Sequence, residues 1–367
     1  MTSAIGTHAF DVVVIGGSQA GLAVGYHLAK RGLRFVILDA GSELGQVWRS
    51  RWDSLTLFTP AQYSGLPGMA FPLPKDAYPS KDDVVTYLQA YVSAFDLPVR
   101  LNAKVTSLTQ REGAYVVATP DEEFTASHVV VATGPFPVPF VPPIAGDLDE
   151  RVFQIHGADY RNPAQLPEGG HVLVVGGGNS GFQIAEELAA TRKVDLAVGK
   201  RVPSLPQRLL GKDLFWWLSG TGFMKVSTDS RLGRKLAKRD VLIGSSARRL
   251  RRSGVTLRKR LASAAGRRAV FGDGSEQDVD AIVWATGYRP DFSWIDIPTI
   301  QDERGGIIHR RGVTDAPGVL FIGLTWQHTR GSALIGFVHD DAAFIASRIG
   351  SRLEARAGLV GTDSERT

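Results

Sequence analysis

The sequence contains no cysteine in its 367 residues. Without thiols the chain can form no disulfide, no thiolate nucleophile and no cysteine-ligated metal site. A dithiol reductase mechanism of the thioredoxin-reductase type is excluded on the same ground. The eight histidines are scattered and show none of the spacings typical of metal ligands. We therefore expect no metal site.

Long hydrophobic runs are also missing. No segment approaches the roughly 18 uninterrupted apolar residues that indicate a membrane-spanning helix. The first ten residues, MTSAIGTHAF, show no charged stretch followed by an apolar one, so we expect no signal peptide. These features predict a cytoplasmic protein without a membrane partner.

The chain has only a mild excess of positive charge. Its net charge is +5 and its pI is near 9.4. Such an excess suits an anionic cofactor as well as nucleic acid, so the charge alone does not distinguish between the two. The arginine-rich stretch RRLRRSG at 248–254 has no interleaved aromatic residues and fits no nucleic-acid motif, so it favours a solvated helix face. We expect no nucleic-acid partner.

A glycine motif occurs twice in the chain. The stretches VVVIGGSQAGLAVGYHLA (12–29) and VLVVGGGNSGFQIAEELA (172–189) each run from an apolar strand pattern through a glycine turn into a helix pattern. In such a turn the backbone N–H groups can approach a pyrophosphate, and the helix N-terminus adds a positive partial charge. The predicted cradle residues are Gly16, Gly17, Ser18 and Gly21 in the first copy, and Gly176, Gly178, Asn179, Ser180 and Gly181 in the second.

The two copies differ in the charge that follows the next predicted strand. Asp39 follows the first copy, whereas Lys200 and Arg201 follow the second. A carboxylate at this position accepts hydrogen bonds from a ribose hydroxyl, and cations there suit a 2′-phosphate. The first copy is therefore predicted to bind FAD or NAD, and the second NADPH. A solvated basic patch remains the alternative for Lys200 and Arg201, because basic residues recur further along the chain.

A second repeated element supports a duplicated plan. The stretches VVVATGPF (129–136) and IVWATGYRP (282–290) both lead a strand into Ala-Thr-Gly, which adds Thr133, Gly134, Thr286 and Gly287 to the candidate sites. The proline-rich run at 135–143 is typical of a linker.

Together these patterns predict an α/β fold with two Rossmann-like dinucleotide-binding domains. We expect a discontinuous FAD-binding domain at 1–145 and 291–367, with an NADPH-binding domain inserted at 146–290. Two nucleotide sites in one chain indicate hydride transfer between two cofactors, and FAD is the economical acceptor.

These motifs resemble those of the two-dinucleotide-binding flavoproteins, and more closely the flavin-containing monooxygenase group with its bacterial CzcO-like and ArsO-like branch. The resemblance covers nearly the whole chain. It rests on the two glycine stretches, LGQVWRSRWDSLTLFTPAQYSGLPG (44–68), YPSKDDVVTYLQAY (78–91), HGADYRNPAQLP (156–167), WATGYRPDFSW and WQHTRGSALIG.

The resemblance implies an NADPH-dependent FAD monooxygenase. Reduced FAD would activate O₂ as a C4a-(hydro)peroxyflavin and oxygenate a small soft nucleophile or a ketone. The partners would be the small-molecule substrate and O₂, and a homodimer remains open. The residues implied to contact FAD are Ala40, Gly45, Gln46, Trp48 and Arg49, the backbone of Val105, and Ser332, Ala333 and Leu334 at the isoalloxazine.

Two of these implied roles have alternatives. Ser332 is expected to start the final helix, with that helix N-terminus facing the flavin, and its side chain could instead serve as a helix cap. Trp48 could be a packing residue instead of a flavin contact.

Two departures from the family pattern concern the catalytic candidates Gln62, His156 and Tyr160. The family signature F-x-G-x-x-x-H-x-x-x-Y is matched only in its second half, by His156 and Tyr160, because Glu150 and Val152 replace its Phe and Gly. His156 could therefore contact NADPH or have a structural role in the linker. The asparagine that animal-type members place near the flavin has no counterpart, although Gln62 lies close in sequence.

Two other functions stay open on the sequence alone. One is a reductase that passes electrons from NADPH through FAD to a quinone or another acceptor. The other is a non-enzymatic redox or nucleotide sensor.

Overall fold

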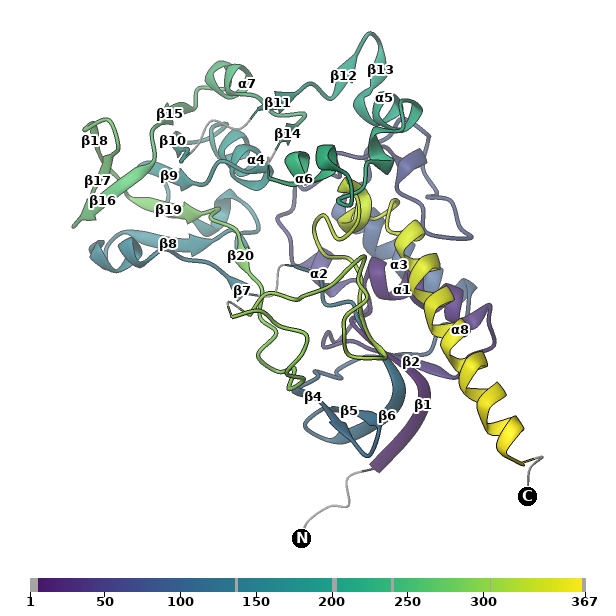
Figure 1. Ribbon diagram of the computed structural model, residues 1–367. Coiled ribbons are helices and arrows are strands. Elements are labelled where there is room, and N and C mark those ends of the chain that lie inside the picture. Colours follow the sequence, from purple (N-terminus) through teal and green to yellow (C-terminus); the bar gives the residue numbers. More distant parts are fainter. Residues whose placement is uncertain (1–5, 136–137, 200–202, 239–240, 304, 365–367) are drawn as a thin grey trace.

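A computed structural model describes residues 6–135, 138–199, 203–238, 241–303 and 305–364. Two sheet-centred units lie side by side, and both chain termini lie at the same end of the molecule (Figure 1).

The first unit is built on a mixed seven-stranded sheet. Strand β1 (Gly6–Ile15) lies at its centre and runs parallel to β2 and β6, whereas β5 and β4 form an antiparallel extension. In order across the sheet, the other strands are β3 (Val99–Arg100), β2 (Phe35–Leu38), β6 (Glu122–Val131), β5 (Ala114–Ala118) and β4 (Ser107–Arg111). Val12, Val13 and Val14 are fully buried, as expected for a parallel strand covered on both faces.

The C-terminal segment returns to this first sheet. Strand β21 (Val319–Phe321) pairs in parallel with β6. Helix α8 (His339–Ser364) packs its apolar face against α1 (Gln19–Ala29), in the same core as α3 (Lys81–Ala94). Completion of the first sheet by a late strand supports a discontinuous first domain, whose boundaries remain a prediction.

The second unit has a five-stranded sheet in which all the strands run parallel. In order across the sheet, these are β15 (Thr256–Arg258), β10 (Lys193–Ala197), β9 (His171–Val175), β19 (Ala281–Trp284) and β8 (Phe153–His156). Helix α4 (Asn179–Leu188) follows β9, and α7 (Ala247–Arg252) precedes β15. A small antiparallel sheet of β16 (Leu261–Ala265), β17 (Arg268–Phe271) and β18 (Glu276–Asp278) adjoins it.

The chain enters and leaves the second unit through one two-stranded connection. Strand β7 (Val138–Pro139) pairs antiparallel with β20 (Tyr288–Arg289), and the Phe140 N–H donates to the Gly287 carbonyl at 2.9 Å. The two connecting segments are therefore held together.

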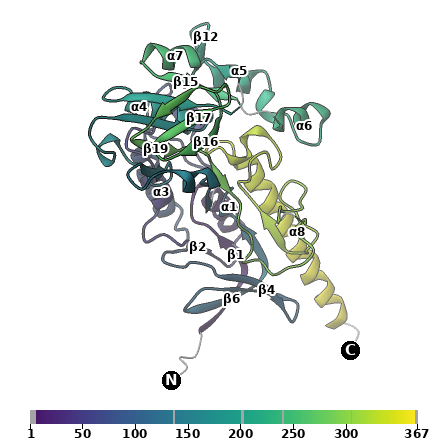
Figure 2. The same ribbon diagram turned by 90° about the vertical axis from the view of Figure 1, so that its left-hand side faces the viewer.

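Residues 203–238 form an excursion from the second unit that reaches the first. Its elements are β11 (Ser204–Leu205), β12 (Arg208–Leu209), β13 (Lys212–Asp213), α5 (Leu214–Gly220) and α6 (Arg231–Ala237). Phe215 and Met224 are buried in one apolar cluster with Phe58 and Leu334 of the first unit. Seen from the side, the β12–β13 hairpin forms the end of the molecule opposite the termini (Figure 2).

Candidate cofactor and active site

The first glycine turn is as tight as its sequence predicts. Gly16 has φ +113°, and a Cβ at this position would lie 2.6 Å from the carbonyl oxygen of Ala132. A Cβ on Gly21 would overlap the carbonyl oxygen of Gly16, so α1 packs directly on the turn. Only glycine is compatible with either position.

Asp39 lies just past the end of β2 and holds this turn in place. One carboxylate oxygen accepts the Gly17 N–H at 2.6 Å, and the other accepts the Gly41 N–H at 2.8 Å. Each oxygen keeps further acceptor capacity for a ribose hydroxyl. The carboxylate is therefore suited both to ordering the cradle and to contacting a nucleotide.

The second glycine turn is as tight as the first at two of its glycines. Gly176 has φ +142°, and a Cβ there would overlap the Ala285 carbonyl. A Cβ on Gly181 would overlap the carbonyl oxygen of Gly176. Gly178 differs, because a Cβ there would meet no atom of the described residues within 4 Å, its two chain neighbours apart. The protein itself does not require glycine at 178, whereas a close ligand would.

The N-termini of the helices that follow these turns are left uncapped. Ser18 and Gly178, the N-cap residues of α1 and α4, make no side-chain cap. By contrast, side chains cap four other helices, namely Ser80 at α3, Asp213 at α5, Ser230 at α6 and Ser246 at α7. A missing cap leaves the first N–H groups of α1 and α4 free to bind an anion such as a pyrophosphate.

The predicted phosphate-binding pair Lys200 and Arg201 lies outside the described residues. Strand β10 ends at Ala197, and Gly199 still lines the cavity described next. The assignment of the pair to a 2′-phosphate therefore stays a prediction from the sequence.

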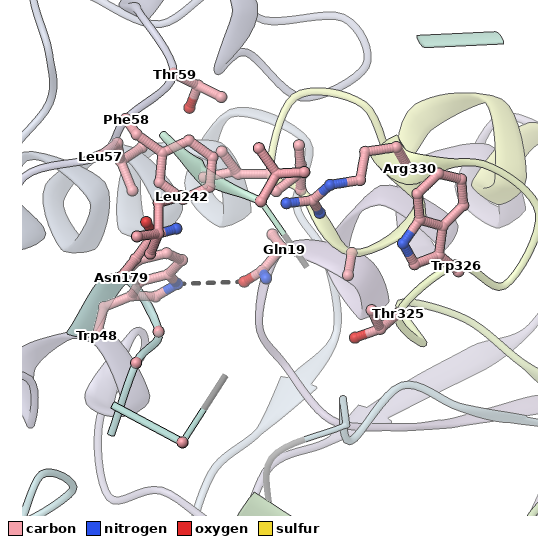
Figure 3. Close-up of a pocket in the computed structure, with 17 residues that line it drawn as sticks. Gln19, Trp48, Leu57, Phe58, Thr59, Asn179, Leu242, Thr325, Trp326 and Arg330 are labelled. Carbon is pink, nitrogen blue, oxygen red and sulfur yellow. Dashed lines mark hydrogen bonds between the residues drawn. The ribbon is translucent and has the colours of Figure 1, made fainter. Parts of the chain in front are cut away.

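A cavity of about 660 Å³ lies between the two units and is lined by the second glycine turn and by the residue that follows the first. The first unit contributes Gln19 and Trp48, and the second contributes Gly178 and Asn179 at the start of α4 (Figure 3). The remaining lining residues are Leu57, Phe58, Thr59, Gly177, Gly199, Val241, Leu242, Thr325, Trp326, Arg330, Ala333, Leu334 and Ile335. The Arg330 guanidinium extends between Phe58 and Trp326 (Figure 3).

A second cavity of about 220 Å³ adjoins the first turn and shares Gln19, Trp48 and Ala333 with the larger one. The Trp48 indole donates to the Gln19 side-chain oxygen at 3.2 Å. The remaining residues that line this smaller cavity are Ser18, Ala20, Val47, Arg51, Ala132, Thr133, Gly134, Pro135, Gly323, Ser332 and Val338. A continuous ligand could run from the first turn past Trp48 to the interface of the units.

Other predicted flavin contacts have structural partners in the protein. The Gln46 side chain accepts from the Ser42 N–H, and Arg49 pairs with Glu43 at 2.7 Å. Gly45 has φ +78° and is buried against Val85. Ala40 follows Asp39 directly, and Val105 packs against the core cluster beside the same strand end. Val47 and Trp48 of the short helix α2 (Gln46–Arg49), and Arg51 just after it, reach the smaller cavity.

The final helix does not start at Ser332, which corrects the prediction. Ser332 belongs to a short 3-10 helix (Arg330–Ala333), and α8 begins at His339. Leu334 is extended, and Gly336 lies so close to the Tyr63 carbonyl that a Cβ would overlap it. The Ser332 hydroxyl is completely buried and accepts the N–H groups of His328 and Thr329.

His156 is held in one neutral tautomer by two backbone groups. Its Nδ1 accepts the Ala158 N–H at 3.0 Å, so its Nε2 carries the proton and donates to the Gly287 carbonyl at 3.1 Å. Burial lowers the pKa of this imidazole, although the bond to Gly287 opposes that shift. Thr286 is bound similarly, through its hydroxyl to the Phe140 carbonyl. His156, Thr286 and Gly287 thus tie together the connection between the units.

The catalytic candidates Gln62, His156 and Tyr160 are not among the residues that line the interface cavity. Tyr160 is fully buried in the core of the second unit and donates to Glu187 at 2.7 Å, and burial raises its pKa. Gln62 is exposed, donates to Asp76 at 3.2 Å and borders a different cavity beside His27 and Phe337.

Several cavity residues were not among the predicted sites. Leu57, Phe58 and Thr59 come from one loop of the first unit, and Trp326 and Arg330 from the segment after β21. Both segments lie in stretches that carry the family resemblance, LTLFTPAQYSG and WQHTRGSALIG. The resemblance of these two stretches to the family was therefore the sequence feature that could have indicated these cavity residues. Within the described residues, no cluster of three metal-ligating side chains occurs and no helix has the length and apolarity to cross a bilayer.

Comparisons with known proteins agree with this geometry. Residues 13–206 match the family model described as pyridine nucleotide-disulphide oxidoreductase. The oxidoreductase CzcO-like of Geobacillus kaustophilus is 45% identical over 93% of this chain and 99% of its own. The probable indole-3-pyruvate monooxygenase YUCCA1 of Arabidopsis thaliana is 27% identical over 93% of this chain and 89% of its own.

A solved flavin-containing monooxygenase from Stenotrophomonas maltophilia superposes with a TM-score of 0.80 at 28% identity, covering 94% of this chain and 99% of that one. The predicted α/β fold with two dinucleotide-binding domains is confirmed, as are the predicted cofactors FAD and NADPH, which fit the two uncapped cradles. The chain is thus an oxidoreductase of the flavin monooxygenase type, and it belongs to the pyridine nucleotide-disulphide oxidoreductase family, among its CzcO-like members.

Proposed function

We propose that the protein uses NADPH and O₂ to transfer one oxygen atom to a small soft nucleophile or a ketone. The balanced reaction consumes NADPH, a proton, O₂ and the substrate, and it releases NADP⁺, water and the oxygenated product. The observation that carries the proposal is the interface cavity, because it is lined by Gln19, which directly follows the first glycine turn, and by Gly177 and Gly178 of the second. Two cofactors bound at these turns would meet there.

The first turn, with Asp39, is assigned to FAD, and the second, with Gly178 and Asn179, to NADPH. Bound FAD would supply hydride acceptance and the activation of O₂. The domain boundaries, 1–145 with 291–367 and 146–290, and the roles of the predicted site residues belong to the same proposal.

The chain's own contribution is to position the cofactors and exclude water. Leu57, Phe58 and Leu242 face Trp326 across the cavity, so its walls are largely apolar (Figure 3). An apolar enclosure protects reactive oxygen species from water and favours an uncharged substrate surface. Asn179 is held in place as its side-chain oxygen accepts the Ile243 N–H at 3.2 Å.

Relatives named as monooxygenases support oxygen transfer over electron transfer to a disulfide. The chain has no cysteine that could relay electrons as a dithiol. A reductase that delivers electrons to a quinone remains the second candidate, because Glu150 and Val152 replace half of the monooxygenase signature.

The test is turnover of the FAD-loaded protein with NADPH, O₂ and methyl phenyl sulfide. We expect the sulfoxide, with its oxygen derived from labelled O₂, and hydrogen peroxide when the sulfide is absent. Phe58→Ala should open the cavity and shift the products toward peroxide, whereas Ile308→Ser, at an exposed site in the C-terminal segment, should not. Slow reoxidation without any oxygenated product, together with acceleration by quinones, would replace this proposal with the reductase.

A further inference from the structure

The β12–β13 hairpin carries exposed leucines at one end of the molecule. Leu210 is 83% exposed and Leu209 48%, and nearby Trp216 of α5 and Leu205 of β11 are 43% and 39% exposed. We call these four side chains the apolar tip. The β12–β13 hairpin lies at the end of the molecule opposite the termini in two views at right angles (Figures 1 and 2).

Folding does not account for the leucine at the turn. Residues Leu209 and Lys212 pair across the hairpin, which leaves a two-residue loop of Leu210 and Gly211 with φ values of 51° and 75°. Such loops favour Asn-Gly, because a leucine loses stability at positive φ. Leu210 is thus unfavourable in its backbone conformation and gains little from burial. A contact outside the chain would explain its presence.

The surroundings of the apolar tip are positively charged. Arg208 and Lys212 are exposed on the same hairpin, and the Lys212 ammonium lies 5.7 Å from the centre of the Trp216 ring. The other basic residues of the described segment 203–238 are not on the hairpin, and α6, which carries Arg231, Arg234 and Lys235, lies apart from it (Figures 1 and 2).

The acidic residues of that segment offset little of this charge. Asp213 is buried and accepts hydrogen bonds from Tyr78 and Gln207, and Asp229 lies 3.5 Å from Arg310. The occupant of this surface should therefore be apolar at its contact with the tip and negatively charged around it.

Two other occupants fit these features less well. A symmetric dimer through the tip would place its basic residues against their own copies, and four side chains fall short of the roughly 800 Å² per partner of a stable interface. Single-stranded nucleic acid offers negative charge, but proteins bind it largely by stacking its bases on aromatic rings, and three of the four tip side chains are leucines.

We propose that the apolar tip docks the protein on an anionic lipid bilayer. Leucine and tryptophan side chains enter the interface between headgroups and acyl chains, while neighbouring lysines and arginines are attracted to the lipid phosphates. Such docking is peripheral and needs no spanning helix. It does not depend on the oxygenation reaction.

The test uses the full-length, FAD-loaded protein and sedimentation with vesicles of phosphatidylcholine alone or mixed with phosphatidylglycerol. We expect binding to the mixed vesicles that weakens with added salt, and much weaker binding to phosphatidylcholine. The double variant Leu209→Ser/Leu210→Asn should bind the mixed vesicles at least tenfold more weakly. Asparagine tolerates the left-handed position, so the thermal midpoint of Leu210→Asn should equal or exceed that of the wild type.

Matched controls separate docking from general stickiness. Ile308→Ser removes a side chain that is 48% exposed, as Leu209 is, and should leave binding unchanged. Arg208→Gln/Lys212→Gln should weaken binding to the anionic vesicles only.

Three results would overturn the proposal. The first is a wild type that stays in the supernatant with the mixed vesicles. The second is a leucine variant that binds them as the wild type does. The third is a different occupant, shown by a dimer in sedimentation velocity that the leucine variant dissociates, or by an oligonucleotide that displaces the vesicles and binds the leucine variant undiminished.

Discussion

The carboxylate of Asp39 accepts the backbone N–H of Gly17 at 2.6 Å, which links the end of β2 to the turn between β1 and α1. Asp39→Ala removes this bond, the bond from Gly41 and the acceptor for a ribose hydroxyl. A hydrogen bond to a charged group contributes about 1.5–3 kcal/mol, so we expect FAD affinity to fall at least roughly tenfold. Titration of the apoprotein with FAD measures this.

Wild-type protein should be purified yellow, with one FAD per chain. Asp273→Ala, at an exposed turn elsewhere, serves as the control and should bind FAD normally. A colourless wild type that cannot be reconstituted would contradict the cofactor assignment itself.

Gly178 and Gly181 should separate ligand binding from folding. At Gly178 an added methyl group meets no atom of the part of the chain that the structure describes, its chain neighbours apart, whereas at Gly181 it overlaps the Gly176 carbonyl. We expect Gly178→Ala to keep its thermal midpoint and raise the KM for NADPH about tenfold or more, because the methyl group occupies ligand space. Gly181→Ala should lower the thermal midpoint. Unchanged NADPH kinetics in Gly178→Ala would show that the ligand does not approach this turn.

Lys200 and Arg201 should determine the preference for NADPH over NADH. Each charge-assisted bond to the 2′-phosphate contributes about 1.5–3 kcal/mol. The double variant Lys200→Gln/Arg201→Gln should therefore raise the KM for NADPH by roughly a hundredfold and leave the KM for NADH nearly unchanged. Arg251→Gln/Arg252→Gln removes two exposed charges elsewhere and is the control. Equal effects on both cofactors would identify the pair as a surface patch.

His156 should make the protein less stable in acid. Burial lowers its pKa from the ordinary value of 6.5, so the unfolded chain takes up a proton at a higher pH than the folded chain does. The stability that depends on neutral His156 is complete above about pH 6.5 and is lost as the pH falls toward the folded-state pKa.

The variant His156→Gln measures that contribution. We expect its thermal midpoint to fall less between pH 7.5 and pH 5.5 than that of the wild type, with the remaining dependence carried by His27, His309 and His328, whose pKa values burial also lowers. His339→Gln, at an exposed site, is the comparison. A variant with the full wild-type pH dependence would refute this account of His156.

Ser332 should prove to be a stability residue. Its substitution by alanine leaves the N–H groups of His328 and Thr329 without their acceptor, which costs about 1–3 kcal/mol in a buried setting. Chemical denaturation of Ser332→Ala should show this loss. Unchanged stability with weakened FAD binding would favour a direct flavin contact instead.

The parts of the fold that were predictable depend on local sequence. The spacing of Gly16 and Gly21, and of Gly176 and Gly181, reflects contacts within one strand–turn–helix unit, so both turns could be placed from the sequence. The end of β2 next to Asp39 could be placed for the same reason.

The cavity was harder to predict because distant segments build it. Phe58 and Trp326 come to line the same cavity only after the C-terminal segment has returned to the first unit. The helix start was misplaced because the break before α8 depends on Gly336 contacting Tyr63, far away in sequence. Gln62 is exposed because the 3-10 turn Ala61–Tyr63 buries Ala61 instead.

The return of the chain to its first sheet affects the order in which the protein can be made. Strand β21 and helix α8 are synthesised after the whole of the second unit, yet β21 pairs with β6 and α8 covers α1. During synthesis, all five strands of the second sheet are therefore made before the first unit is complete. Until α8 has been made, the side of α1 that it covers stays exposed. A chain truncated near residue 300 would thus contain every strand of the second sheet but would lack β21 and α8 of the first unit.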